Sequence, residues 1–543
     1  MQQRKVSLIL LNGVVYTVDD ANSVAEAIAI RENEIAAVGT TEEIRSHFEA
    51  DTVIDLKGKA VYPGFTDAHA HFEGLGALLS NLNLEGTTSV EQIRTKVAEW
   101  AATLPEGMWL RGRSWDQNDW ETKSFPIHQM LDDVAGDHPA YLKRIDGHAL
   151  WVNKKALDLA GVTKATAEPP GGMIMRDADG NPTGVLIDNA IDLIDSVMPA
   201  PSVEERTRAV ESAVQECLRV GLTEVHDMGV DKELIDIYKK LIEQSRFPFR
   251  IYAAIGGTGK DWQEYLRSGP DIGQNDERLT VRALKLYVDG ALGSRGAALI
   301  EPYTDDPGNR GLTLTSSEAL RTASAQALDK GFQVCVHAIG DRANHIALNI
   351  FEDVFKANRI KADGARFRVE HVQVLDELDI PRFAKANVIP SMQPTHCTSD
   401  MYWAEDRLGP TRVKFAYAWR SLLNTGCIIP GGSDFPVERP DPLRGFYAAI
   451  TRQDEANWPN GGWYPDQRMT REEALKAFTT WAAYAAFEER RRGSIEVGKL
   501  ADIVVLSNDI MKCDVSEILK VRVLHTIVGG EVAYSATEGM SAR

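Results

Sequence analysis

The chain has 543 residues, of which 43% are hydrophobic and 26% charged, a composition that is ordinary for a folded globular protein and excludes disorder as the main state. Its formal net charge is −19, and because an acidic surface repels phosphate backbones, nucleic acid is excluded as a partner. No apolar run approaches the length of a membrane span, and the run near the N-terminus is too short for a signal peptide. The five scattered cysteines contain no CxxC pair, which favours a reducing, cytoplasmic location.

Short strand patterns occupy both ends of the chain. Near the N-terminus they cover residues 8–11, 14–18, 27–30 and 35–38, and near the C-terminus 503–506, 521–528 and 532–534. Neither end has enough strands to form a good sheet alone. The sequence therefore predicts a small β-sandwich built from both termini, residues 1–60 together with 494–543.

Between the two ends, strand patterns alternate with helical patterns. Eight apolar β-like runs lie at residues 60–65, 222–226, 249–255, 283–288, 332–336, 367–369, 388–391 and 427–430. Helical patterns such as those at 203–220, 317–330 and 343–358 separate them. Eight βα units predict an α/β fold, a (β/α)8 TIM-like barrel over residues 61–493. The gap after the first run is too long for one helix, so residues from about 80 to 200 are predicted to be an insertion that caps the barrel mouth.

Two histidines follow the first apolar run, in the segment Pro-Gly-Phe-Thr-Asp-Ala-His-Ala-His at residues 63–71. Residues i and i+2 of a strand point to the same side, so His69 and His71 can offer two imidazoles to one metal ion. A single HxH triplet is a weak motif, and two incidental loop histidines explain it equally well.

Further metal-binding residue types occur at the ends of other predicted strands. His337, His371 and Asp434 each come at or just after the end of such a run, and Lys285 lies inside the apolar run 283–288. A charged lysine is costly there unless it is paired, so a buried ion pair is the alternative. Each residue alone fits a hydrogen-bonded core position. Together, at the face where barrel active sites lie, they favour a metal centre.

The combined pattern resembles the amidohydrolase superfamily, specifically its YtcJ-like branch (amidohydrolase family 3), which includes enzymes of the N-substituted formamide deformylase type. The resemblance covers essentially the whole chain and rests on segments at residues 60–71, 144–148 with Asn153, 181–186, 221–227, 285–295 and 493–502. It implies a divalent metal centre in which His69, His71 and Asp434 bind a first ion and His337 and His371 a second. Lys285 matches the lysine that is carbamylated in two-metal members.

The chemistry of these groups fits that implication. An ammonium cannot ligate a cation, but a neutral lysine amine condenses with CO2 to an anionic carbamate, and burial favours the neutral amine. Neutral imidazoles with carboxylate oxygens suit zinc first, while manganese, iron and nickel also fit. A centre with one metal and a merely structural Lys285 stays open.

The resemblance further implies a metal-dependent hydrolase that cleaves an amide-type C–N bond of a small molecule through a metal-activated water, with Asp434 as proton shuttle. Candidates for stabilising the developing oxyanion are His148, His226 and Arg144, and His226 is expected to face the barrel mouth. Residues expected to contact substrate are Arg144, Asp146, Trp115, Arg295 and His396. Each has a structural alternative, such as ordinary packing for the tryptophan or an ion pair for Arg295.

Several alternatives stay open at this point. The same ligand set could act on an ester, a lactone, a carbamate or a cyclic amide. An inactive amidohydrolase-like interaction protein is disfavoured, because no ligand position is substituted. The substrate is not predicted, since barrel specificity lies in variable loops. By analogy with relatives of this kind, we also expect a homodimer.

Overall fold

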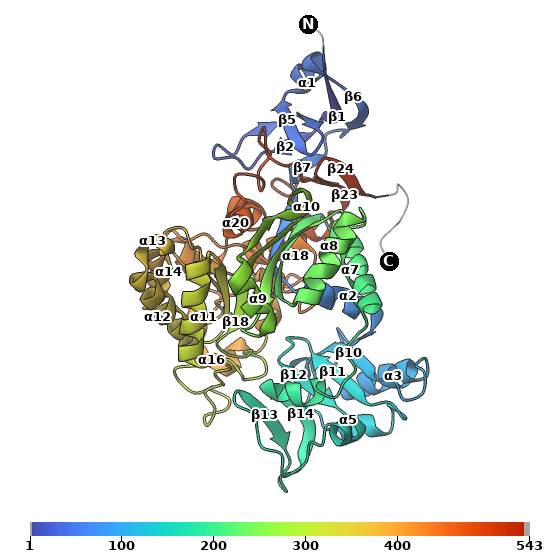
Figure 1. Cartoon of the computed structure of the whole chain (residues 1–543), viewed down its shortest axis with the longest axis vertical. Helices are drawn as coiled ribbons and strands as arrows, with labels where there is room; N and C mark the ends of the chain where they lie inside the picture. Colours follow the sequence, from blue (N-terminus) through green and yellow to red (C-terminus); the bar gives the residue numbers. More distant parts are fainter. Residues whose placement is uncertain (1–2, 537–543) are drawn as a thin grey trace.

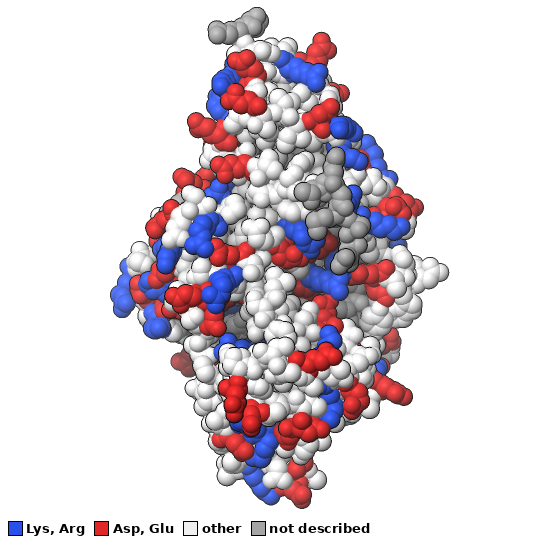
Figure 2. Space-filling model, turned by 90° about the vertical axis from the view of Figure 1, so that its right-hand side faces the viewer, with Lys and Arg blue, Asp and Glu red and all other residues white. Residues whose placement is uncertain are grey.

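The computed structural model describes residues 3–536. Three parts follow one another along the longest axis: two small terminal sheets at one end, a barrel in the middle and an inserted region at the other end (Figure 1). Acidic and basic side chains are interspersed over the face drawn in Figure 2, so on this face the negative charge is spread out. Within the described residues, no helix combines the length and the apolar character needed to cross a membrane.

Two terminal sheets are present, the first built from N-terminal strands alone and the second from strands of both ends of the chain. One has the order β5 (Glu34–Gly39), β4 (Ala27–Arg31), β1 (Arg4–Leu11) and β6 (Phe48–Asp55). The other has the order β24 (Glu531–Ser535), β23 (Val523–Val528), β22 (Ile503–Leu506), β7 (Ala60–Pro63), β2 (Val14–Tyr16) and β3 (Val24–Ala25). Leu8 and Ile28 of the first sheet share a buried cluster with Val61 and Ile503 of the second. Residues 537–543 of the predicted C-terminal span lie outside the described residues.

The central sheet is a nearly closed parallel barrel. Its strands run in the order β21 (Ile389–Ser391), β20 (Arg368–His371), β19 (Gln333–Ala338), β18 (Leu279–Tyr287), β16 (Arg250–Gly256), β15 (Leu222–Val230) and β8 (Phe65–Ala70). The short β17 (Asp271–Gly273) pairs antiparallel with β18. Residues 430–435 cross the remaining gap: Met392 N donates to Pro430 O on one side, and Asp434 N donates to His69 O on the other. The predicted TIM-like barrel is confirmed.

Two of the eight predicted barrel strands differ in the structure. Residues 60–63 form β7 of a terminal sheet, where Val61 pairs with Val505, and the first barrel strand β8 begins only at Phe65. Residues 427–430 form no regular strand, because Pro430 has no N–H to donate and the barrel is closed by the irregular segment that follows.

Helices surround the barrel. The predicted helices at 203–220, 317–330 and 343–358 correspond to α7 (Val203–Arg219), α11 (Ser317–Lys330) and α12 (Asp341–Ala357). Ser202 and Glu205 form a reciprocal capping box at the start of α7. The residues Val210, Val214 and Leu218, spaced by four positions, bury one stripe of that helix against the barrel core.

The region between β8 and α7 forms its own six-stranded sheet. The strand order is β13 (Gly172–Arg176), β14 (Pro182–Asp188), β12 (Ala149–Val152), β11 (Ala140–Arg144), β10 (Leu110–Trp115) and β9 (Leu82–Asn83). Two hydrophobic clusters belong to this region, one containing Trp115 and Trp151 and the other Leu150 and Leu186. It lies at the end of the molecule opposite the terminal sheets (Figure 1).

A buried ion pair joins the barrel to a terminal sheet. Arg250 of β16 donates to both carboxylate oxygens of Asp502, at 2.8 and 3.0 Å. Burial acts to raise the pKa of Asp502, but Arg250 holds it below its usual value. We predict that Asp502→Asn lowers the free energy of unfolding by about 3 kcal/mol, because Arg250 then remains buried without a counter-charge. Urea unfolding measures this change.

The matched control for this prediction is Asp51→Asn. Asp51 pairs with Lys5, and both side chains are exposed. An exposed pair contributes less than about 1 kcal/mol, so the control protein should unfold close to the wild-type midpoint. Equal losses in the two variants would contradict the stabilising role of the buried pair.

Candidate metal centre

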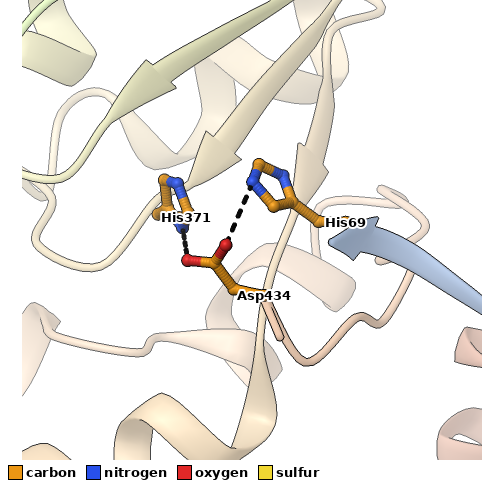
Figure 3. Close-up of side chains that lie close together, drawn as sticks. All are labelled: His69, His371 and Asp434. Atoms are coloured by element: carbon orange, nitrogen blue, oxygen red, sulfur yellow. Dashed lines mark ion pairs between the residues drawn. The ribbon is translucent and has the colours of Figure 1, made fainter. Parts of the chain in front are cut away.

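Three buried side chains converge at one end of the barrel. His69 comes from β8, His371 from the end of β20 and Asp434 from the segment that closes the barrel (Figure 3). One ligand atom of each lies within 4.8 Å of the others. His69 Nε2 is 3.6 Å from Asp434 Oδ1, and His371 Nδ1 is 4.0 Å from Asp434 Oδ2. His69 Nε2 and Asp434 Oδ1 can therefore bind the same ion, whereas the His371 nitrogen nearest Asp434 is Nδ1, which also bonds Gln393.

His71 extends this group, as its i, i+2 relation to His69 predicts. Its Nε2 is 3.2 Å from Asp434 Oδ1. Its Nδ1 donates to the carbonyl of Met228 at 2.8 Å. The HxH pair therefore directs both Nε2 atoms toward the same carboxylate.

Hydrogen bonds to Nδ1 of His69 and His371 determine which nitrogen of each ring carries the proton. His69 Nδ1 bonds Glu370 Oε2 at 2.6 Å, and His371 Nδ1 bonds Gln393 Oε1 at 2.8 Å. Both acceptors place the proton on Nδ1 and leave the Nε2 lone pair free. Metal-binding histidines are held in this way, with the second nitrogen donating to a carboxylate or carbonyl oxygen.

The charge states also fit a divalent cation. Burial lowers the pKa of His69 to about 4 and the pKa of His371 well below its usual value, so both imidazoles are neutral near pH 7. Burial acts to raise the pKa of Asp434, but the hydrogen bond with His71 holds it well below its usual value. Neutral imidazoles beside an ionised carboxylate are the donors that zinc takes in proteins.

Lys285 lies at the same centre. It projects from β18, its side chain is buried, and its Nζ is 3.2 Å from His69 Nε2. Among the described residues no carboxylate forms an ion pair with it, so the ion-pair alternative is not met. Burial lowers the pKa of Lys285 and favours the neutral amine.

His337 adjoins this group from β19. Its ring centroid is 4.5 Å from that of His371. Its Nε2 is 3.4 Å from the carbonyl of Gly290 and 3.7 Å from Asp289 Oδ1. Burial raises the pKa of Asp289 to about 7. His337 is therefore next to His371 without contacting Asp434 as the other histidines do.

His148 reaches the centre from the inserted region. Its Nδ1 bonds Asp188 Oδ1 at 2.6 Å, and its ring centroid is 5.0 Å from that of His337. Burial acts to lower the pKa of His148, but Asp188 raises it above the usual value. The second oxygen of Asp188 is buried and has no hydrogen-bond partner among the described residues.

A cavity of about 710 Å³ lies over this centre, and the barrel and the inserted region both contribute to its lining. This volume suits a small molecule. The barrel contributes His71, Lys285, His337, His371, His396 and Asp434, and the inserted region contributes Arg113, Lys143, Arg144, Asp146, His148 and Asp188.

Arg144, Asp146 and His396, three of the residues expected to contact substrate, line the cavity. Arg144 is ion-paired with both Asp116 and Asp146. His396 Nε2 is 3.8 Å from Asp434 Oδ2 and makes no hydrogen bond within the described residues. The charge of Arg144 is thus already balanced, whereas His396 has a free polar atom beside the centre.

Three other predicted site residues lie outside the cavity lining. His226 is buried in the barrel interior and its Nδ1 bonds Arg368 at 2.9 Å, so the expectation that it faces the mouth is not met. Trp115 packs in the core of the inserted region and donates to the carbonyl of Leu142 at 2.7 Å. Arg295 is ion-paired with Asp305.

Sequence reasoning missed Glu370 and Asp188, the partners of His69 and His148. Glu370 had a signal, since it is an acid directly after the buried run 367–369. For Asp188 the one signal was its place at the end of the apolar stretch 185–187.

The backbone at the site is strained. His371 and Asp434 have φ values of 78° and 59°, which residues with a Cβ rarely adopt and which cluster at functional sites.

A closed parallel barrel with imidazole and carboxylate groups at the C-terminal ends of its strands defines a barrel enzyme with a candidate metal centre. A family model described as amidohydrolase family matches residues 52–534. The chain belongs to this family and is a hydrolase.

Individual relatives cover nearly the whole chain. The protein YtcJ of Bacillus subtilis (strain 168) is 34% identical over 96% of this chain and 98% of its own length. The N-substituted formamide deformylase of Arthrobacter pascens is 29% identical over 98% of each. Among solved structures, an uncharacterised metal-dependent hydrolase from Pyrococcus horikoshii OT3 matches with a TM-score of 0.75 and 26% identity, over 94% of this chain and 99% of that one. The predicted YtcJ-like branch is confirmed.

Proposed function

We propose that this chain is a metal-dependent hydrolase that cleaves an amide-type C–N bond of a small molecule. The observation that carries the proposal is the convergence of His69 and His71 on the ionised carboxylate of Asp434 beneath the cavity, with His371 beside them. The printed name of the Arthrobacter relative, a formamide deformylase, supports the choice of a C–N bond.

In this proposal His69, His71 and Asp434 would hold a first divalent cation, and His337 and His371 would hold a second. Lys285, carbamylated on its neutral amine, would supply anionic oxygen ligands. Zinc is the first choice for these donors, and manganese, iron or nickel fit next. When bound, such a cation acidifies a water molecule and polarises the scissile carbonyl.

Asp434 moves the proton. Its carboxylate accepts a proton from the attacking water as the water oxygen adds to the carbonyl carbon. As the C–N bond breaks, Asp434 passes this proton to the leaving nitrogen. The products are a carboxylic acid and an amine, and Asp434 is again ionised.

His148 stabilises the charge that develops on the carbonyl oxygen. Asp188 raises the pKa of His148 above its usual value, which favours a ring that carries a proton on Nε2 as well as on Nδ1. The Nε2–H then donates to the developing oxyanion. Asp188 acts as a positioning residue, since its bond to Nδ1 fixes the orientation of the ring.

Removal of metal tests the proposal. Protein stripped with a chelator is expected to lose hydrolysis of N-formyl and N-acyl amides, and added zinc or manganese with bicarbonate should restore it. His71→Ala should prevent this recovery, while His525→Ala, in the remote strand β23, should recover like the wild type. Full activity in the stripped protein would contradict the proposal.

A further inference from the structure

Two cationic side chains of the inserted region line the cavity that contains the candidate metal centre. They are Arg113 of β10 and Lys143 of β11. The two strands are parallel, and the register pairs Arg113 directly with Lys143. Paired residues on neighbouring strands share one face of a sheet. The sheet therefore presents two positive charges together at the cavity wall.

Neither cation has a carboxylate partner among the described residues. The recorded bond of Arg113 runs from its Nη2 to the carbonyl of Ile145 at 3.1 Å, and its buried Nε has no partner. Lys143 forms no ion pair or side-chain hydrogen bond with the described residues. The nearest sequence neighbour, Arg144, pairs with Asp116 and Asp146. Asp116 and Asp146, the carboxylates next to this end of the strands, are thus ion-paired with Arg144 and not with Arg113 or Lys143.

Two neighbouring cations without an ion-pair partner are unfavourable once they leave water. In agreement, the pKa values of Arg113 and Lys143 are both lowered, chiefly by burial and for Lys143 also by the charge of Arg113, although Asp146 acts in the opposite direction on both. An anion bound between Arg113 and Lys143 would offset both the desolvation of the two charges and their mutual repulsion. A guanidinium fork beside an ammonium is well suited to a carboxylate.

We propose that Arg113 and Lys143 form a subsite for a carboxylate of the substrate. The substrates are then amides that carry a carboxylate, such as N-formyl or N-acyl amino acids. Asp192 and Asp195 also line this cavity, and their negative charge disfavours a doubly charged phosphate relative to a single carboxylate. This inference rests on the proposed amide hydrolysis for the identity of the scissile bond.

A matched pair of substrates tests the subsite on the zinc-loaded protein. N-formylphenylalanine and N-formylphenethylamine differ in the carboxylate alone. We expect kcat/KM to favour the carboxylate-bearing amide by about 10- to 100-fold, the range of a charge-assisted hydrogen bond. Lys143→Gln and Arg113→Gln should each reduce this ratio about tenfold, and the double variant should bring it near one.

Arg111→Gln is the matched control. Arg111 lies on the same strand, but its Nη2 bonds the carbonyl of Pro199 at 2.6 Å and it lies outside the cavity lining. The control should keep the wild-type ratio. Equal kcat/KM for the two amides in the wild type, or a ratio unchanged in Arg113→Gln and Lys143→Gln, would overturn the subsite.

Calorimetric binding of N-acetylphenylalanine and N-acetylphenethylamine separates this inference from the proposed function. Preferential binding of the carboxylate compound that Arg113→Gln and Lys143→Gln abolish, with no cleavage of any amide, would retain the subsite and reject the hydrolase. Cleavage of both formamides at equal kcat/KM, with no preference in binding, would retain the hydrolase and reject the subsite.

Discussion

Asp434→Ala is expected to lower kcat by about 10³- to 10⁴-fold. The carboxylate serves twice in the proposed reaction, as a ligand and as the group that carries the proton from water to the leaving nitrogen. Its position supports both roles, because Oδ1 faces His69 and His71 while Oδ2 faces His371 and His396. Single-turnover kinetics on an N-formyl amide measures the loss.

Asp434→Asn separates shape from charge. The amide keeps the volume of the carboxylate but cannot accept the proton, so its kcat should fall nearly as far as in the alanine variant. Asp119→Ala is the control, because Asp119 lines the same cavity without an ion pair to any described residue and its loss should leave most of the activity. An Asp434→Ala enzyme within about tenfold of the wild type would contradict the assigned role.

Lys285→Ala is expected to abolish metal binding at one site and to reduce activity to background. Lys285 is buried 3.2 Å from His69 Nε2, and its neutral amine is the species that condenses with CO2. Without the carbamate, the centre would lack the anionic oxygen ligands that this lysine would supply. Metal analysis per chain should report a lower ratio than in the wild type, and native mass spectrometry of the wild type should detect one added CO2.

Chemical rescue provides the sharper test of this lysine. Acetate or propionate can enter the space left by Lys285→Ala and supply two carboxylate oxygens, so part of the metal content and activity should return. Lys239→Ala is the control, because Lys239 pairs with Asp271 outside the cavity lining and its loss should not change the metal content. An unchanged metal ratio in Lys285→Ala would argue for a purely structural lysine.

The barrel could be predicted because each buried parallel strand is a nearly continuous apolar run. The run at 60–65 was predicted as one barrel strand, and the division into β7 and β8 has a physical reason. It is apolar throughout, and the point where it passes from a terminal sheet to the barrel is set by β22, which comes from the other end of the chain. The closing segment 430–435 could not be predicted as a strand, because its irregular hydrogen bonds follow from the two strands it joins.

The candidate ligands could be predicted because chemistry-bearing residues at strand ends meet at one face of a barrel. The roles of His226, Trp115 and Arg295 depend on contacts that no local pattern reports. Arg368, the carbonyl of Leu142 and Asp305 are respectively their partners. His226 is buried in the barrel, Trp115 is buried in the core of the inserted region, and Arg295 forms an ion pair, so none of the three side chains lines the cavity.

The proposed hydrolysis depends on the binding of a catalytic metal ion by His69, His71 and Asp434. Anomalous diffraction at the zinc edge, on crystals of the zinc-loaded protein, tests this binding. An anomalous peak is expected about 2.0–2.2 Å from His69 Nε2, His71 Nε2 and a carboxylate oxygen of Asp434. Fully loaded crystals without a peak among these three side chains would contradict it.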